Sequence, residues 1–255
     1  MLKQSKEKPI AKKKLIDLVD RRLFAYSFLK RVFIEEATKE FLELLITENL
    51  LEIFIAKEEN KQIKQGIETI YLYLKNPGVL SDENITELSS DYVNLFIGPG
   101  KLVAAPYESV YLSEKRLVFQ EQTIEVRRAY YKHNLVPEKL QSEPDDHIAL
   151  ELDFMGLLCK EIGKDLRANK LTAARKKLNT QKKFMKEHLM LWALEFSENV
   201  QKGAREDFYM GAAQMLTGLL TVDQDMIKES LRQLKLRIDQ DKEKNKKHKL
   251  KSVKN

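Results

Sequence analysis

Apolar residues recur at helical spacing along most of this 255-residue chain, and this periodicity limits the fold more than any other feature. The clearest example is the segment 63–74, in which Ile63, Ile67, Ile70 and Leu74 follow the i, i+4, i+7, i+11 pattern. No segment shows a convincing alternation of apolar and polar residues, and Gly and Pro are scarcer than in an average protein. The sequence therefore predicts one all-α globular domain of about nine or ten helices.

The apolar stripes place the expected helices along the chain. We expect helices over 15–33, 41–55, 63–74, 82–97, 114–132 and 143–163, one long helix through 184–196, and two more through 208–219 and 227–238. The helix over 143–163 is apolar on almost every side, which predicts a buried, central position. Gly211 and Gly218 would allow close contact between helices. A polar linker precedes the central helix, and it is the expected position of a hinge, near 134–143.

Basic residues gather at the two ends of the chain. Residues 1–14 contain six Lys and one Glu, a formal charge of +5, and residues 242–255 contain seven Lys and one Glu, a formal charge of +6. Because the whole chain carries +6, the body over 15–241 carries −5. We expect flexible lysine-rich ends, of which residues 1–10 and 243–255 are dispensable for folding, around an acidic body that suits a basic ligand.

The sequence also indicates a cellular compartment. No apolar run reaches the roughly 18 residues that span a bilayer, so no stable membrane insertion is expected. The N-terminus lacks the apolar stretch and cleavage site of a secretory signal. A single cysteine, Cys159, has no partner for an internal disulfide and is expected in the core. These features predict a cytoplasmic protein.

Helix-breaking residues concentrate in three segments: 92–100, 106–111 and 143–147. These segments hold three of the six prolines and two of the nine glycines, together with Tyr, Asp and His. Loops held by a rigid scaffold commonly carry binding residues. The working surface is therefore expected where these segments meet.

Gly98-Pro99-Gly100 follows a predicted helix and lacks the strand-to-helix context of a phosphate-binding loop. Local physics favours a helix stop, with Gly98 in a left-handed conformation. Just before it, Leu95 and Phe96 are adjacent and cannot both point the same way. One of them is expected to line the loop that follows.

Asp145, Asp146, His147 and Glu151 form the sharpest chemical cluster. Pro144 suits a first helical turn, and the two Asp residues suit the positive end of a helix dipole. His147 and Glu151 are four residues apart, so they share a face, and a structural pairing between them is one interpretation. A metal-dependent hydrolase that uses Asp146, His147 and Glu151 is the other, with His133 or His188 as a further ligand.

Four motifs occur in order along the chain. An aromatic-x-x-Leu-Phe segment spans Tyr92 to Phe96, and the Gly/Pro-rich loop follows at 98–100. A Pro-aromatic-x-Ser-Val stretch runs from Pro106 to Val110. Pro144-x-Asp146-His147 then enters a helix with Glu151-Leu152-x-Phe154-Met155, and a Phe184…His188-Leu189…Trp192…Phe196 helix lies downstream.

With these motifs, the chain resembles the TorD-like family of redox-enzyme maturation chaperones, which includes the DmsD proteins. The resemblance covers residues 15–225 and leaves out the two lysine-rich ends. Position 107 is Tyr where Trp also occurs in the family, a difference that bears on client preference. The resemblance implies an all-helical cytoplasmic chaperone without enzymatic turnover, occurring as a monomer or a domain-swapped dimer.

The resemblance also implies a partner. Such chaperones bind a molybdenum-containing oxidoreductase of the dimethyl sulfoxide reductase class before export or cofactor insertion, many through its twin-arginine signal peptide. No cofactor is expected, although the family includes weak guanine-nucleotide binders. We expect segments 92–111 and 143–151 to form one peptide groove, in which the carboxylates pair with the arginines. Its expected residues are Tyr92, Leu95, Phe96, Gly98, Pro99, Gly100, Pro106, Tyr107, Glu108, Ser109, Pro144, Asp145, Asp146, His147 and Glu151.

Two other classes stay open at this point. One is the metal-dependent hydrolase. The other is a helical nucleic-acid-binding protein that uses its basic ends, although the expectation from the resemblance is no nucleic-acid partner.

Overall fold

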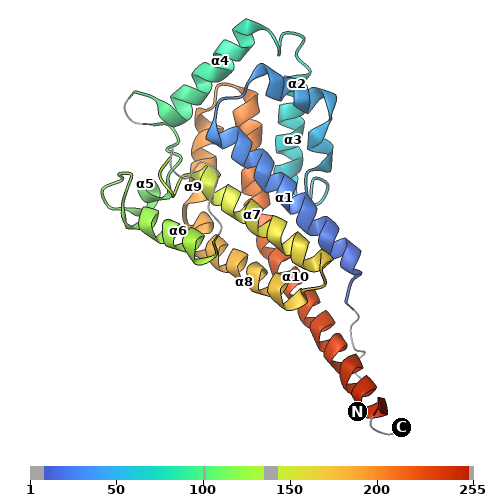
Figure 1. Cartoon of the computed structure of the whole chain (residues 1–255). Coiled ribbons are helices and arrows are strands. Elements are labelled where there is room, and N and C mark those ends of the chain that lie inside the picture. The colour runs from blue at the N-terminus through green and yellow to red at the C-terminus, as the bar shows by residue number, and fades with distance from the viewer. Residues whose placement is uncertain (1–8, 100–101, 135–142, 253–255) are drawn as a thin grey trace.

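A computed structural model of the chain describes residues 9–99, 102–134 and 143–252, with side chains to Lys246. Within these ranges the protein is all-α, with ten α-helices and no strand (Figure 1). The elements are α1 (Lys12–Ile34), α2 (Lys39–Thr47), the 3-10 helix η1 (Leu50–Ile53), α3 (Lys61–Leu74), α4 (Asp82–Tyr92), the π-helix η2 (Val93–Ile97), α5 (Glu108–Leu112), α6 (Glu121–Lys132), α7 (Ile148–Arg167), α8 (Leu171–Glu187), α9 (Leu189–Gly203) and α10 (Asp207–Ser252). The predicted fold class and number of helices are confirmed.

Helix α7 is the central helix of the fold, as its apolar sequence predicts. It packs along α1 on one side and against α8 on the other, while α10 packs against α3, α8 and α9 (Figure 1). A buried ion pair joins the first and last helices: Asp223 on α10 accepts from Arg22 Nη2 at 2.8 Å and from the Tyr26 hydroxyl at 2.6 Å. Removing either partner of such a pair would leave a buried charge uncompensated. This pair therefore fixes α10 against α1.

Several predicted boundaries were wrong, and local backbone conformation explains them. The expected helix over 41–55 breaks at Asn49, whose φ of 48° is left-handed, and continues only as η1. The expected loop up to Ser113 contains the short helix α5. The expected helix over 114–132 starts only at Glu121, after Arg116 and Phe119 adopt positive φ. Left-handed residues cannot continue an α-helix, whatever the apolar pattern.

In the C-terminal half, one predicted helix is divided in two, and two predicted helices are joined into one. The long helix expected through 184–196 is two helices, α8 and α9, which meet at His188 with φ −129° and ψ −89°. The two helices expected over 208–219 and 227–238 are one continuous helix, α10. No proline or glycine separates them between residues 219 and 226, so the backbone has no reason to break there.

The ends of the chain fall partly outside the described residues. Of the N-terminal segment 1–14, residues 1–8 are not described, whereas Ile10 donates its backbone N–H to Gln233 Oε1 at 2.7 Å. Helix α10 continues through Ser252, and its side chains over 241–246 are exposed. The dispensability of both ends for folding stays a prediction. Because Ile10 contacts Gln233, a truncation that leaves the fold intact should stop before Ile10. Most of the expected hinge, 135–142, also lies outside the described residues.

No helix in the described ranges combines the length and apolarity that crossing a membrane requires.

Glycines allow the close approach of α3 and α10 that the sequence suggests. A Cβ on Gly211 would lie 2.7 Å from the carbonyl oxygen of Gly66, and a Cβ on Gly218 would lie 2.8 Å from the backbone nitrogen of Ile63. Real Cβ atoms do not approach backbone this closely, so the two helices would have to separate.

We predict that Gly211→Ala lowers the free energy of unfolding by about 1–3 kcal/mol, despite the better helix propensity of alanine. Gly78→Ala is the matched control, because the nearest atom to its Cβ would be a side-chain oxygen at 3.7 Å. Urea unfolding followed by circular dichroism measures both variants. An unfolding free energy of Gly211→Ala equal to or above that of the wild type would contradict the close packing.

Candidate functional site

A short antiparallel pairing joins the two proline-containing segments. Glu108 N donates to Asp146 O at 3.0 Å, and Ile148 N donates to Pro106 O at 2.8 Å. Tyr107 and His147 lie opposite each other in this bridge, with their ring centroids 5.2 Å apart. Within this bridge His147 is extended, with φ −71° and ψ 135°, and α7 begins at Ile148 instead of near Pro144 as expected.

The two aspartates of the 143–147 segment hold neighbouring elements. Asp146 Oδ2 accepts from the backbone N–H of Ser109 at 2.8 Å and so caps the start of α5. Asp145 accepts from Arg127 Nε at 2.8 Å, and its carbonyl accepts from the Tyr130 hydroxyl at 2.9 Å, which fixes α6. Both side chains are fully buried. The two aspartates therefore interact mainly with α5 and α6, and not with the positive end of the α7 dipole as expected.

The helix stop at Gly98 positions two aromatic rings. The chain leaves α4 through the π-helix η2, which ends at Gly98, where the N–H donates to Val93 O. Gly98 has the positive φ that favours glycine, 32°, but its ψ of 164° lies outside the left-handed helical conformation that the sequence predicted. This turn places Phe96 beside Tyr92, with ring centroids 5.0 Å apart. Leu95 points instead into the core. π-Helical turns are frequent at functional sites.

Asp91, which the sequence did not single out, anchors this turn. Its buried carboxylate accepts the backbone N–H groups of Arg205 and Glu206 at 3.0 and 2.9 Å, just before α10 begins. The helix α4 and the aromatic rings that follow it are therefore fixed to the start of α10.

A groove of about 510 Å³ lies where these segments meet α1, and we call it the acidic groove. It is lined by Arg31, Ile34, Glu35, Glu36, Thr38, Tyr92, Phe96, Ile97, Pro106, Tyr107, Glu143 and His147. Three carboxylates face one guanidinium along its wall. Arg31 is itself engaged, because its Nε lies 3.2 Å from Glu35 Oε1 and its guanidinium lies over the Phe41 ring. The groove thus combines an aromatic floor with net negative charge.

Two of the carboxylates accept only neutral hydroxyl groups among the described contacts. Glu143 Oε2 accepts from the Tyr107 hydroxyl at 3.1 Å, and Glu36 accepts from the Ser89 hydroxyl. A carboxylate has room for further donors beyond one hydroxyl. Burial raises the pKa of Tyr92 above its usual value, and the charges of Glu143 and Glu36 raise it further, so these charges act across the groove.

The predicted site residues divide between the groove and the layer beneath it. Tyr92, Phe96, Pro106, Tyr107 and His147 line the groove. Gly98 is partly buried and Pro99 is exposed, and both follow the groove residue Ile97. Pro144 lies just before α7, and Gly100 is outside the described residues. Leu95, Glu108, Ser109, Asp145, Asp146 and Glu151 are buried and do not line it. The binding role of all of them stays a prediction.

The three carboxylates that line the acidic groove, its acidic wall, belong to Glu35, Glu36 and Glu143, which were not among the predicted site residues. Glu35 and Glu36 follow the last turn of α1, where the helix dipole is negative and acidic residues are unfavourable. Such a placement is a local signal that could have marked them. Glu143 stood in the 143–147 segment, but its side chain was not assigned a role.

Beneath the groove lies a buried acidic cluster formed by Glu108, Glu151 and His188. His188 Nδ1 lies 3.0 Å from Glu108 Oε2, and both side chains are almost fully buried. Glu151 is completely buried, and neither of its oxygens, nor the Trp192 Nε1, has a hydrogen-bond partner among the described residues. Burial raises the pKa of Glu151 well above its ordinary value, and repulsion by Glu108 raises it further. Burial and the nearby Glu108 therefore both favour the neutral form of Glu151.

The hydrolase interpretation finds no support in this geometry. Asp146 caps α5, and His147 is the N-cap of α7, where its Nδ1 accepts from Ala149 N at 3.1 Å. The expected side-chain pairing of His147 with Glu151 is not among the hydrogen bonds of either residue. The described ranges contain no group of three or more His, Cys, Asp or Glu that could hold a metal ion.

Comparison with known proteins agrees with the motifs around the groove. Residues 57–198 match the family described as the nitrate reductase delta subunit. The chain belongs to this family, which is the TorD-like family that its motifs resemble.

Individual relatives extend the match over most of the chain. Chaperone protein TorD of Aliivibrio salmonicida is 28% identical over 204 residues, which cover 80% of this chain and 93% of that protein. Chaperone protein TorD of Vibrio atlanticus is 27% identical over 207 residues, with the same coverage. The probable Tat proofreading chaperone DmsD of Haemophilus influenzae is 34% identical over 131 residues, which cover 51% of this chain and 56% of that protein.

The neutral form of Glu151 predicts a stability that falls as pH rises. Because its folded pKa is raised, the unfolded chain loses this proton first, above the ordinary value of 4.5. The contribution of Glu151 to the free energy of unfolding is thus present below pH 4.5. It is lost as pH rises toward the folded pKa, by at most about 1.4 kcal/mol per pH unit. We expect Glu151→Gln to melt above the wild type by a margin that grows from pH 5 to pH 8. A margin that stays constant over this range, as we expect for the exposed control Glu68→Gln, would contradict the assignment.

His147 predicts the opposite slope on the acidic side. Burial lowers the pKa of His147 from 6.5 to about 3, so its contribution to stability is present above pH 6.5 and is lost as pH falls toward 3. Asparagine stays neutral and also serves as an N-cap. Melting curves of His147→Asn are therefore expected to decline less steeply than those of the wild type between pH 6.5 and 4. Parallel declines would show that His147 is not buried in its neutral form.

Proposed function

We propose that this protein is a cytoplasmic chaperone that binds the precursor of a molybdenum-containing oxidoreductase by its twin-arginine signal peptide, in the acidic groove, and assists its maturation before export. Family membership and the TorD and DmsD relatives support the chaperone class. The observation that carries the peptide assignment is the groove itself, with aromatic rings and an excess of carboxylates along one cavity.

The groove offers an apolar peptide segment a suitable floor. Phe96 and Pro106 are buried, the ring of Tyr107 is half-buried, and Ile97 at the rim is 57% exposed. Aromatic side chains and an exposed aliphatic rim bury large apolar areas at interfaces. The hydrophobic part of a signal peptide has this chemistry.

The carboxylates suit the two arginines. Guanidinium groups form bidentate hydrogen bonds with carboxylates, and lysine cannot reproduce this fork. Glu143 and Glu36 face the cavity with acceptor capacity left, whereas Asp145, Asp146, Glu108 and Glu151 are buried under it. The groove carboxylates, rather than the buried ones, are the proposed arginine partners.

The test is calorimetric titration with a synthetic peptide of two adjacent arginines followed by a leucine- and alanine-rich segment. Glu143→Gln keeps an acceptor for the Tyr107 hydroxyl and removes only the charge. It should lose about 1.5–3 kcal/mol of binding free energy, or about tenfold to a hundredfold in affinity. Tyr107→Ala should also weaken the peptide, with an unchanged dependence on salt concentration, because it removes apolar contact and no charge.

Two controls separate recognition from general attraction. The same peptide with two lysines should bind the wild type more weakly, and the difference should shrink in Glu143→Gln. Glu68→Gln removes an exposed charge on α3, away from the groove, and should bind the arginine peptide like the wild type. Unchanged affinity in both groove variants, with melting curves that show folded protein, would move recognition to another surface.

The proposal includes no cofactor and no catalytic step. Weak guanine-nucleotide binding remains an expectation from the family resemblance, as does the choice between monomer and domain-swapped dimer.

A further inference from the structure

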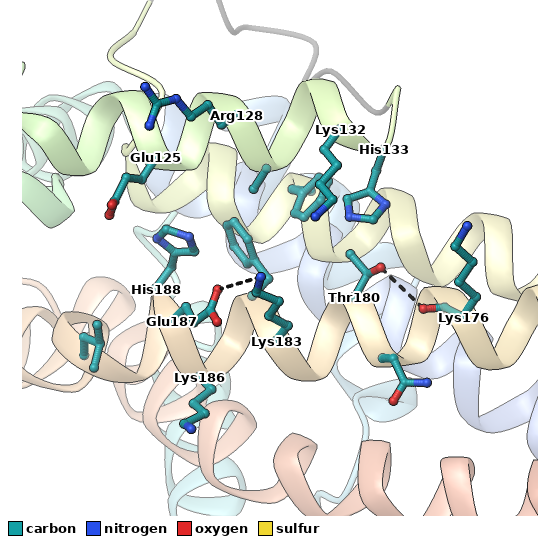
Figure 2. A pocket seen from close by; sticks show the side chains of 15 residues that line it. Glu125, Arg128, Lys132, His133, Lys176, Thr180, Lys183, Lys186, Glu187 and His188 are labelled. Atoms are coloured by element: carbon teal, nitrogen blue, oxygen red, sulfur yellow. Dashed lines mark hydrogen bonds and ion pairs between the residues drawn. The ribbon is translucent and has the colours of Figure 1, made fainter.

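A second cavity, of about 900 Å³, lies between α6 and α8, with α7 beneath it (Figure 2). It shares no lining residue with the acidic groove. We call it the basic cleft, because five Lys and Arg side chains line it against two Glu. The cations are Arg128 and Lys132 on α6 and Lys176, Lys183 and Lys186 on α8.

Most of these cations have no ion-pair partner within the described part of the chain. Only Lys183 has one, Glu187, at 3.6 Å (Figure 2). Partial burial lowers the pKa of His133, and the charges of Lys132, Lys176 and Lys183 lower it further. The positive charges therefore act together around the middle of the cleft, on a body of the protein that is otherwise acidic.

The floor of the basic cleft is a row of rings. His133 lies 6.3 Å from Phe154, Phe154 lies 4.8 Å from Phe184, and Phe184 lies 4.7 Å from His188, measured between centroids. Leu191 lines the far end of the cleft and is 55% exposed, so it adds accessible apolar surface to the lining. A ligand that fits this cleft has an apolar surface with negative charges beside it.

The spread of the cations distinguishes between two kinds of anionic ligand. Lys176 and Lys186 are ten residues apart on α8, a distance of about 15 Å along the helix. Phosphate groups prefer helix N-termini, where several backbone N–H groups converge. The basic cleft instead runs mainly along the flanks of α6 and α8, whose C-terminal ends it reaches near His133 and Glu187, and it meets a helix N-terminus only at the first turn of α9, at His188 and Leu191. Distributed carboxylates on a polypeptide fit this arrangement better than one compact polyphosphate.

We infer that the basic cleft is a second docking site, which binds an acidic amphipathic helix of a partner protein between α6 and α8. An amphipathic helix in a groove presents apolar side chains at i, i+3, i+4 and i+7, and these would lie on Phe184 and Leu191. Its flanking Asp and Glu side chains would pair with Lys132 on one wall and Lys183 on the other. This chemistry is the reverse of that of the acidic groove, so one polypeptide segment cannot satisfy both sites.

The test uses fluorescence anisotropy of a labelled synthetic peptide with leucines at helical spacing and glutamates on both flanks. The full chain is titrated as wild type, as Lys132→Glu/Lys183→Glu and as Lys160→Glu/Lys235→Glu. The last two variants change the charge equally, and all four lysines are exposed. Lys160 on α7 and Lys235 on α10 lie outside the cleft and have no ion pair with another described residue. We expect the cleft variant to lose at least about tenfold in affinity, and the control to stay within about twofold of the wild type.

A second arm tests the apolar floor and the class of ligand. Leu191→Ser should weaken the peptide severalfold while the melting temperature stays close to that of the wild type. Equal losses in the two charge-reversal variants would assign the binding to overall charge or to the lysine-rich ends, and would overturn the site. Displacement of the peptide by tripolyphosphate at equal or lower concentration would assign the cleft to small polyanions, and would also overturn the proposal. Absence of binding to the wild type at millimolar protein would do the same.

Discussion

The antiparallel pairing of Pro106–Glu108 with Asp146–Ile148 is the contact on which the groove and the layer beneath it depend. It sets Tyr107 against His147 on the groove side and directs Glu108 toward His188 on the inner side. The same segment starts α5, through the Asp146 cap, and α7, through the His147 cap. Two backbone hydrogen bonds and two side-chain caps thus place both helix starts and the aromatic wall of the groove.

The acidic groove and the basic cleft lie on either side of this layer. His188 lines the basic cleft with its ring and reaches Glu108 with its Nδ1, while Glu108 donates its backbone N–H to Asp146, in the segment that carries His147 of the acidic groove. If a signal peptide and an acidic segment belonged to one client, two modest affinities would combine through a high effective concentration. The opposite charges of the two sites would also fix the direction in which such a client lies.

Periodicity in the sequence was sufficient for the fold class and for the core, because apolar stripes decide which face of each helix is buried. It was not sufficient at Asn49, Phe119 and His188, where single residues leave the helical region and apolar spacing carries no signal. In the site, the positions of the aromatic residues Tyr92, Phe96 and Tyr107 at the groove could be predicted, because the prolines and glycines around them indicate loops at the surface. The acidic wall was not predicted, since Glu35 and Glu36 come from the distant end of α1, and only their unfavourable position at the end of that helix marks them locally. Asp145 and Asp146 were expected at the surface as helix-start carboxylates, and they are buried because α5 and α6 supply their donors.

Hydrogen–deuterium exchange with and without the arginine peptide tests the groove assignment most directly, because it reports where the peptide lies without any substitution. The account predicts slower exchange in 93–97, 107–111 and the last turn of α1, with the α6 and α8 segments of the basic cleft unchanged. Protection confined to α6 and α8, or to the lysine-rich end of α10, would contradict it.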